Sequence, residues 1–135
     1  MYKNILVPIA ADHNPDTGRA LAAARLLADD GAKITALTVV EEIPPYVASQ
    51  LPEGQLDHTR EEVLIGLKGE LGGATDVHPV VVTGHAARSI LEYANEHGAD
   101  CIVVASHRPS FQDFFLGSTA ARVVQHAQCA VHVIR

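Results

Sequence analysis

CIVVASHRPSFQDFFLGSTAARVVQHAQCAVHVIR, residues 101–135, contains two short apolar segments with an amphipathic segment between them. The two apolar segments, Cys101–Ala105 and Ala130–Ile134, are rich in β-branched residues, which favours strands buried on both faces of a sheet. The segment between them predicts an amphipathic helix over Ser118–Ala127. A strand, a helix and a second strand in this order form the unit from which parallel sheets are built, with a right-handed crossover.

The same alternation runs through the rest of the chain. Three more strands are predicted at residues 5–9, 34–40 and 77–82. Three more helices are predicted: one between its N-cap Asn14 and its stop signal Gly31, one at about 52–71, and one at 86–97. One domain, residues 1–135, is therefore expected to form a three-layer α/β/α fold, with four helices on a doubly wound, five-stranded parallel sheet. The predicted strand order is 3-2-1-4-5, and ligands bind such sheets at the carboxyl ends of the strands beside the switch between strands 1 and 4.

The composition excludes several classes of protein. Apolar residues make up 47% of the 135 residues, which favours a packed core, and the formal net charge is −6. This charge argues against a nucleic-acid partner, because affinity for a phosphate backbone depends on clustered Lys and Arg. No apolar run reaches the ~20 residues of a membrane span, and no targeting segment precedes the first strand, so we expect no membrane partner and a cytoplasmic location. Cys101 and Cys129 are expected to be buried free thiols.

The motifs of common catalytic and cofactor sites are missing. The sequence has no P-loop signature, no Gly-x-Gly-x-x-Gly after the first strand and no Gly-x-Ser-x-Gly. The eight histidines are scattered, without the spacing of zinc ligands. The motifs therefore assign no catalytic residue and no metal ligand.

The loop after the fourth strand carries residues suited to an anion. Gly117-Ser118-Thr119 begins the last helix, where unpaired backbone N–H groups and the helix dipole favour a phosphate. At the other end of this loop, Ser106, His107 and Arg108 offer further donors, and an arginine can hold phosphate oxygens in a bidentate fork. The alternative is that Ser118 is an ordinary N-cap and that His107 and Arg108 are solvated loop residues.

Four segments together resemble the universal stress protein family. They are Ile5–Ile9, Leu37–Val40, Gly84 before the third helix, and the tail from Leu116 to Ile134. The resemblance covers the whole chain and is strongest over residues 101–135.

The resemblance implies a site for ATP or another adenine nucleotide, with or without Mg²⁺. ATP-binding members carry Gly-x-x-Gly, a spacer and Gly-[Ser/Thr]; here Ala105 and Arg108 stand at the first two glycines, the spacer is shorter, and Gly117-Ser118 is retained. This Ser-His-Arg-Pro version resembles a subgroup of small bacterial members that still bind ATP. At the adenosine end Ala10 stands where the family usually has an aspartate, with Asp12 nearby, and Val39 matches the residue whose backbone meets the adenine. The predicted nucleotide-binding residues are Pro8, Ile9, Ala10, Asp12, Val39, Ala105, Ser106, His107, Arg108, Gly117, Ser118 and Thr119.

Three functions from different classes remain open at this point. The first is a nucleotide-binding regulatory module of the stress response. The second is a nucleotide-independent dimerisation or interaction protein with a degenerate site. The third is a slow ATPase or self-phosphorylating protein, although the sequence shows no dedicated general base. Because exposed sheet edges are usually paired and the family commonly dimerises through its last strand, a homodimer is expected. Its interface would consist of Ala130, Val131, His132, Val133 and Ile134.

Overall fold

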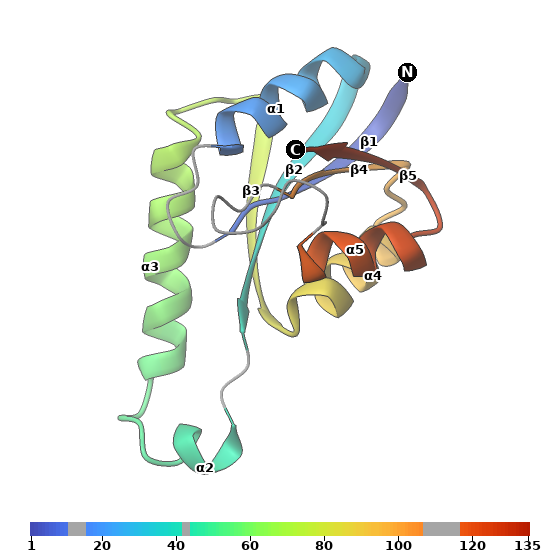
Figure 1. Cartoon of the computed structure of the whole chain (residues 1–135). Coiled ribbons are helices and arrows are strands. Elements are labelled where there is room, and N and C mark those ends of the chain that lie inside the picture. The colour runs from blue at the N-terminus through green and yellow to red at the C-terminus, as the bar shows by residue number, and fades with distance from the viewer. Residues whose placement is uncertain (11–15, 42–43, 107–116) are drawn as a thin grey trace.

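Five parallel strands form one sheet in the order β3-β2-β1-β4-β5. Figure 1 shows the computed structural model, which describes residues 1–10, 16–41, 44–106 and 117–135. The strands are β1 (Tyr2–Pro8), β2 (Ala28–Glu41), β3 (Val77–Gly84), β4 (Cys101–Ala105) and β5 (Ala130–Ile134). The predicted sheet and strand order are confirmed, and β4 and β5 have the predicted bounds.

Four long helices, as predicted, cover the sheet in the described part of the chain. They are α1 (Asp16–Leu27), α3 (Gln55–Glu70), α4 (Ala86–Glu96) and α5 (Ser118–His126). The N-cap predicted for α1, Asn14, lies outside the described residues. The sequence reasoning missed one further helix, the single turn α2 (Pro45–Ala48), in which Pro45 takes the first helical position that proline favours. None of the described helices is both long enough and apolar enough to cross a membrane.

The role predicted for Gly31 is wrong. α1 ends earlier, at Leu27, and Gly31 lies inside β2 with a φ of 77°. The pairing of β1 with β2 shifts at this point, from Tyr2 opposite Ala28 to Asn4 opposite Lys33. The extra residues of β2 form a bulge there, and glycine is suited to it because it adopts positive φ without steric cost.

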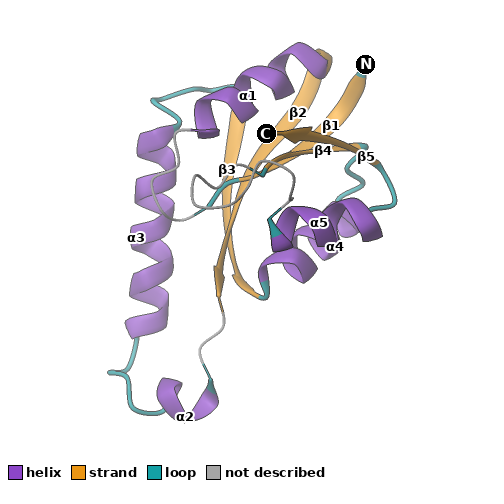
Figure 2. Cartoon of the chain, viewed as in Figure 1, coloured by secondary structure: helices purple, strands orange, loops and turns teal. Residues whose placement is uncertain are grey.

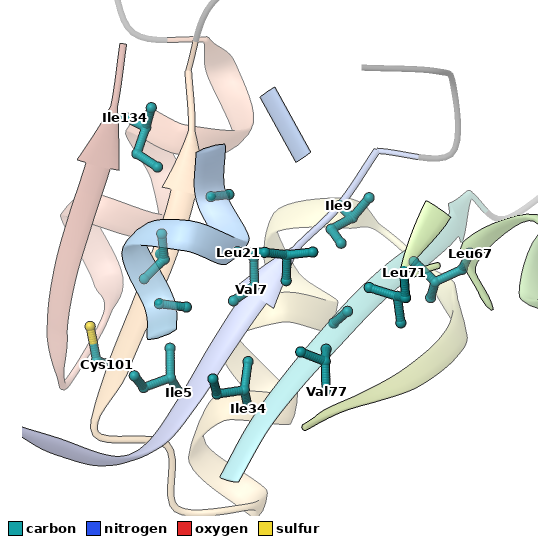
Figure 3. Close-up of a cluster of buried hydrophobic side chains, with 14 residues drawn as sticks. Ile5, Val7, Ile9, Leu21, Ile34, Leu67, Leu71, Val77, Cys101 and Ile134 are labelled. Atoms are coloured by element: carbon teal, nitrogen blue, oxygen red, sulfur yellow. The ribbon is translucent and has the colours of Figure 1, made fainter. Parts of the chain in front are cut away.

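The core has one layer on each face of the sheet, as Figure 2 shows for the helices. On one face, α1 and α3 pack through Leu21 and Leu67 against Ile5, Val7 and Ile34, which Figure 3 shows in close-up. On the other face, α4 and α5 cover a second cluster of buried residues. That cluster consists of Leu6, Leu37, Ile90, Ala94, Ile102 and Val123. Successive strand residues therefore point to opposite layers, which makes the strands apolar on both faces, as the sequence pattern predicts.

The topology brings three strand ends together. β1 pairs with β2 on one side and with β4 on the other. The connection after β1 therefore leads to one half of the sheet, and the connection after β4 leads to the other half. Because all strands are parallel, the ends of β1, β2 and β4 lie at the same edge. This edge is the position at which doubly wound sheets bind ligands.

Candidate functional site

A cleft opens at the carboxyl ends of β1, β2 and β4, where the topology predicts a ligand site. The strands contribute one part of its lining and the N-terminal turns of three helices contribute most of the rest. The lining residues are Pro8, Ile9, Ala10, Leu37, Val39, Val104 and Ala105, with Thr17, Ala20, Ala86, Ile90, Thr119 and Ala120 from α1, α4 and α5.

The cleft brings together six of the predicted nucleotide-binding residues: Pro8, Ile9, Ala10, Val39, Ala105 and Thr119. Ser118 is exposed and is not part of the lining. Asp12, His107 and Arg108 lie outside the described residues. The remaining two predicted residues, Ser106 and Gly117, are bonded to each other at the two ends of the loop.

Ser106 connects three elements beside the cleft. Its backbone N–H donates to the carbonyl of Ile134 in β5 at 2.8 Å. Its buried hydroxyl Oγ accepts a hydrogen bond from the backbone N–H of Gly117 at 2.9 Å. The sequence reasoning expected this hydroxyl and this N–H to be available to a phosphate. The structure corrects the expectation for the Gly117 N–H, which is bonded to Ser106 and fixes the start of α5 to the end of β4, whereas the Ser106 hydroxyl accepts this bond and keeps its own O–H as a donor.

Among the described residues, the first turn of α5 has backbone N–H donors without a helical acceptor. Gly117 is the N-cap and no side chain caps the helix, so the reading of Ser118 as an ordinary N-cap is wrong. The first helical hydrogen bond runs from the N–H of Ala121 to the carbonyl of Gly117, at 2.9 Å. Within the described residues, the N–H groups of Ser118, Thr119 and Ala120 therefore have no helical acceptor. With the helix dipole, such groups form an anion site, and Thr119 and Ala120 belong to the cleft wall.

The described lining of the cleft carries no charged side chain, and its polar side chains are the hydroxyls of Thr17 and Thr119. No carboxylate among these residues repels an anion. The sequence reasoning missed Thr17, Ala86 and Ala120. Their position in the chain could have identified them, because each lies in the first turn of a helix that starts at the ligand-binding edge of the sheet.

The chemistry for other kinds of site is missing from the described part of the chain. It holds no group of three His, Cys, Asp or Glu side chains that could bind a metal. Both cysteines are free, as predicted, and Cys101 is buried, but the predicted burial of Cys129 is wrong because this residue is partly exposed. Burial raises the pKa of the Cys101 thiol to about 11, so this thiol is not a nucleophile at neutral pH.

The Ser106–Gly117 hydrogen bond leads to a stability prediction. Ser106→Ala leaves the N–H of Gly117 without an acceptor, and we expect it to lower the free energy of unfolding by about 1–2 kcal/mol in urea titrations. The matched control is Ser89→Ala, because the Ser89 hydroxyl makes no hydrogen bond in the described part of the chain. The free energy of unfolding of this control should stay within about 0.5 kcal/mol of the parent value. Equal losses in the two variants would show that the Ser106 hydroxyl does not hold the α5 corner.

Comparison with known proteins identifies the family. The model of the universal stress protein family matches residues 1–135. The relative "Universal stress protein A homolog 2" of Coxiella burnetii is 32% identical, over 99% of this chain and 95% of the relative. The solved structure of universal stress protein UspA from Lactobacillus plantarum is 28% identical and superposes with a TM-score of 0.70, covering 99% of this chain and 98% of that one.

Two solved structures of lower identity share the fold and contain a ligand. One is a universal stress protein in complex with cAMP, 22% identical with a TM-score of 0.69, covering 99% of this chain and 97% of that one. The other, from Archaeoglobus fulgidus, is in complex with dAMP and is 18% identical with a TM-score of 0.61, covering 99% of this chain and 98% of that one. The family model spans every residue, and the strand order is the one predicted from the pattern of strands and helices. This chain belongs to the universal stress protein family.

Proposed function

We propose that this protein is a regulatory module that binds an adenine nucleotide in the cleft at the ends of β1, β2 and β4. The observation that carries the proposal is the start of α5, where Thr119 and Ala120 form part of the cleft wall and their N–H groups lack helical acceptors within the described part of the chain. Backbone N–H groups at a helix N-terminus, aided by the dipole, bind a phosphate without any basic side chain. An acidic chain with no charged residue on the described cleft lining can therefore hold an anionic ligand.

The other end of the cleft suits the base. Ile9, Leu37 and Val39 form apolar walls there. A flat aromatic base can pack between such side chains while backbone groups at the strand ends meet its polar edge. The complexes of two family members with cAMP and dAMP support an adenine nucleotide over other anions. Since each of those ligands has one phosphate, a single phosphate corner is enough for the proposed mode.

The direct test is titration of the purified protein with AMP, cAMP, ADP and ATP, followed by calorimetry and thermal unfolding. A ligand present at about 100 times its Kd stabilises the folded state by about 2.7 kcal/mol, which raises the Tm of a domain of this size by several degrees. GMP at the same concentration carries the same ribose and phosphate on a different base, so it controls for recognition of adenine and should produce a smaller shift. The proposal fails if none of the four adenine nucleotides gives saturable heat or a rise in Tm at millimolar concentration. Repeating the titration with Mg²⁺ tests whether the metal contributes.

A second function, homodimerisation through β5, is favoured by the edges of the sheet. β3 and β5 are the two edge strands, and β3 carries Pro79, which removes one edge N–H and hinders pairing. β5 contains no proline, and no described segment covers its outer side. We infer that the interface includes the five predicted residues Ala130–Ile134, and that the dimer can form with or without nucleotide.

Catalytic turnover is the weakest of the three hypotheses. The hydroxyls of Thr17 and Thr119 are the only described side-chain groups of the cleft that could take part in proton or phosphoryl transfer. Neither has a neighbouring general base on the described lining. The proposal is therefore a binding module, in which the nucleotide acts as a signal.

A further inference from the structure

A groove runs between α4 and α5, which pack against each other on one face of the sheet (Figure 1). Each helix lines this α4–α5 groove with residues that recur at helical spacing and therefore lie on one side of the helix. The lining includes Arg88, Leu91, Glu92 and Asn95 from α4, and Arg122 and Gln125 from α5. It shares no residue with the proposed nucleotide cleft, so the groove is a separate surface.

The groove has one unpaired arginine on each of its two helices. The side chains of Arg88 and Arg122 are exposed, and within the described part of the chain neither forms an ion pair or a hydrogen bond. The carboxylate of Glu92, which also lines the groove, is likewise unpaired among the described residues. A guanidinium presents its N–H donors as a rigid fork that fits the two oxygens of a carboxylate. Two such forks are therefore accessible in the groove and are not used by the fold.

The charge of the last part of the chain differs from that of the rest. The whole chain has 16 Asp and Glu against 10 Lys and Arg, but residues 117–135 contain no acidic residue. α5 therefore contributes Arg122 and His126 to the groove, and no carboxylate. The negative net charge of the protein disfavours contact with an acidic partner at most other positions. Complementary charge thus directs an acidic partner to this groove.

The remaining lining favours a peptide over a small inorganic anion. Leu91 is partly exposed and supplies aliphatic surface, and Asn95 and Gln125 supply amides that can donate to and accept from a peptide backbone. Along α4 the lining extends from Arg88 to Asn95, about 10 Å at a rise of about 1.5 Å per residue, which three or four extended residues cover. A small inorganic anion would use the arginines and leave Leu91 and the amides without contacts.

We propose that the α4–α5 groove binds a short acidic segment of a partner protein, in which acidic residues flank an aliphatic one. The carboxylates of the segment would pair with Arg88 and Arg122, and its aliphatic side chain would pack on Leu91. The amides of Asn95 and Gln125 would bond to its backbone. This surface is independent of the nucleotide cleft and needs no nucleotide to form.

The experiment measures the fluorescence polarisation of a labelled peptide, Gly-Ser-Asp-Leu-Glu-Asp-Leu-Glu-Ser-Gly, during titration with the nucleotide-free protein at low salt. We expect saturable binding that weakens as salt is added, and binding at least about tenfold weaker when Asn and Gln replace Asp and Glu in the peptide. Arg88→Ala and Arg122→Ala should each lower the affinity by about three- to tenfold.

Arg60→Ala is the matched control for the two arginine variants. Arg60 is exposed and has no partner in the described part of the chain, but it lies on α3, which packs on the other face of the sheet. The control removes the same charge from the protein, so its affinity for the peptide should stay within about twofold of the parent value. All three variants replace exposed side chains without described partners, and their Tm should match that of the parent.

A second pair of variants tests the acidic residue of the groove. Glu92→Gln removes its carboxylate and should raise the affinity for the peptide by about threefold, whereas Glu96→Gln, at an exposed position of α4 outside the lining, should change it less. Equal affinities in the Arg88, Arg122 and Arg60 variants overturn the proposal, as does the absence of saturation. Equal binding of the amide peptide would also overturn it. Displacement of the peptide by inorganic phosphate at the same concentration would replace the acidic segment with a small anion.

Discussion

Replacing Thr119 with glutamate is expected to weaken the binding of AMP and cAMP by about 100-fold, while the affinity for adenosine falls by about threefold or less. Thr119 lies in the first turn of α5 and on the cleft wall, so the new carboxylate would stand where the proposal places the phosphate. Two negative charges about 5–6 Å apart repel each other by about 3 kcal/mol at the effective dielectric constant of a protein surface. The variant should fold normally, because an acidic residue in the first turn of a helix is favourable.

Two further variants separate charge at the helix end from charge in the cleft. Ser118→Glu places the same charge one residue earlier, on an exposed position outside the cleft lining, and should lower the affinity for AMP by about tenfold or less. Thr119→Gln keeps the size of glutamate without its charge, and its affinity for AMP should be close to that of the parent protein. Calorimetric titration of all three with AMP and adenosine measures the difference. Unchanged AMP affinity in Thr119→Glu would mean that the phosphate lies somewhere other than the start of α5.

The sequence was sufficient for the sheet because most signals for the strands are local. β4 and β5 are short and rich in β-branched residues, so their bounds are visible without any knowledge of their neighbours, although β4 is buried and β5 is buried only at Ile134. Gly31 shows the limit of this reasoning. A glycine after an amphipathic helix is a common stop signal, but a glycine in a bulge has the same local sequence signature. Only the pairing of Asn4 with Lys33 across β1 and β2 distinguishes the two.

The candidate site shows a similar division. Topology and the family resemblance led to the ends of β1, β2 and β4, and Val39 and Thr119 indeed line one cleft. The sequence could not show that the N–H of Gly117 already donates to the hydroxyl oxygen of Ser106, because that contact joins residues 11 positions apart.

The backbone of β5 determines which of its groups could join a second copy. The N–H of Ser106, just after β4, donates to the carbonyl of Ile134, so the polar backbone groups of Ile134 point toward β4. Because these groups alternate in direction along a strand, those of Val131 and Val133 point away from the sheet. Both of these valine side chains are partly exposed. A second β5 can therefore pair with this edge around a two-fold axis and bring the valines of the two copies together.

Val133→Lys is expected to convert the proposed dimer to monomer at tens of micromolar protein, measured by sedimentation velocity. At a two-fold interface each substitution acts twice, so two ammonium groups would replace two apolar side chains and repel each other. Ile65→Lys is the control, since Ile65 is also apolar and 71% exposed but lies on α3, away from β5. It should sediment like the parent. A dimer that persists in Val133→Lys, or one that dissociates equally in Ile65→Lys, would exclude the β5 edge as the interface. Ser106 bonds to β5 through its N–H and to the α5 corner through its hydroxyl oxygen, so repeating the measurement with saturating AMP tests whether nucleotide binding and dimerisation are coupled.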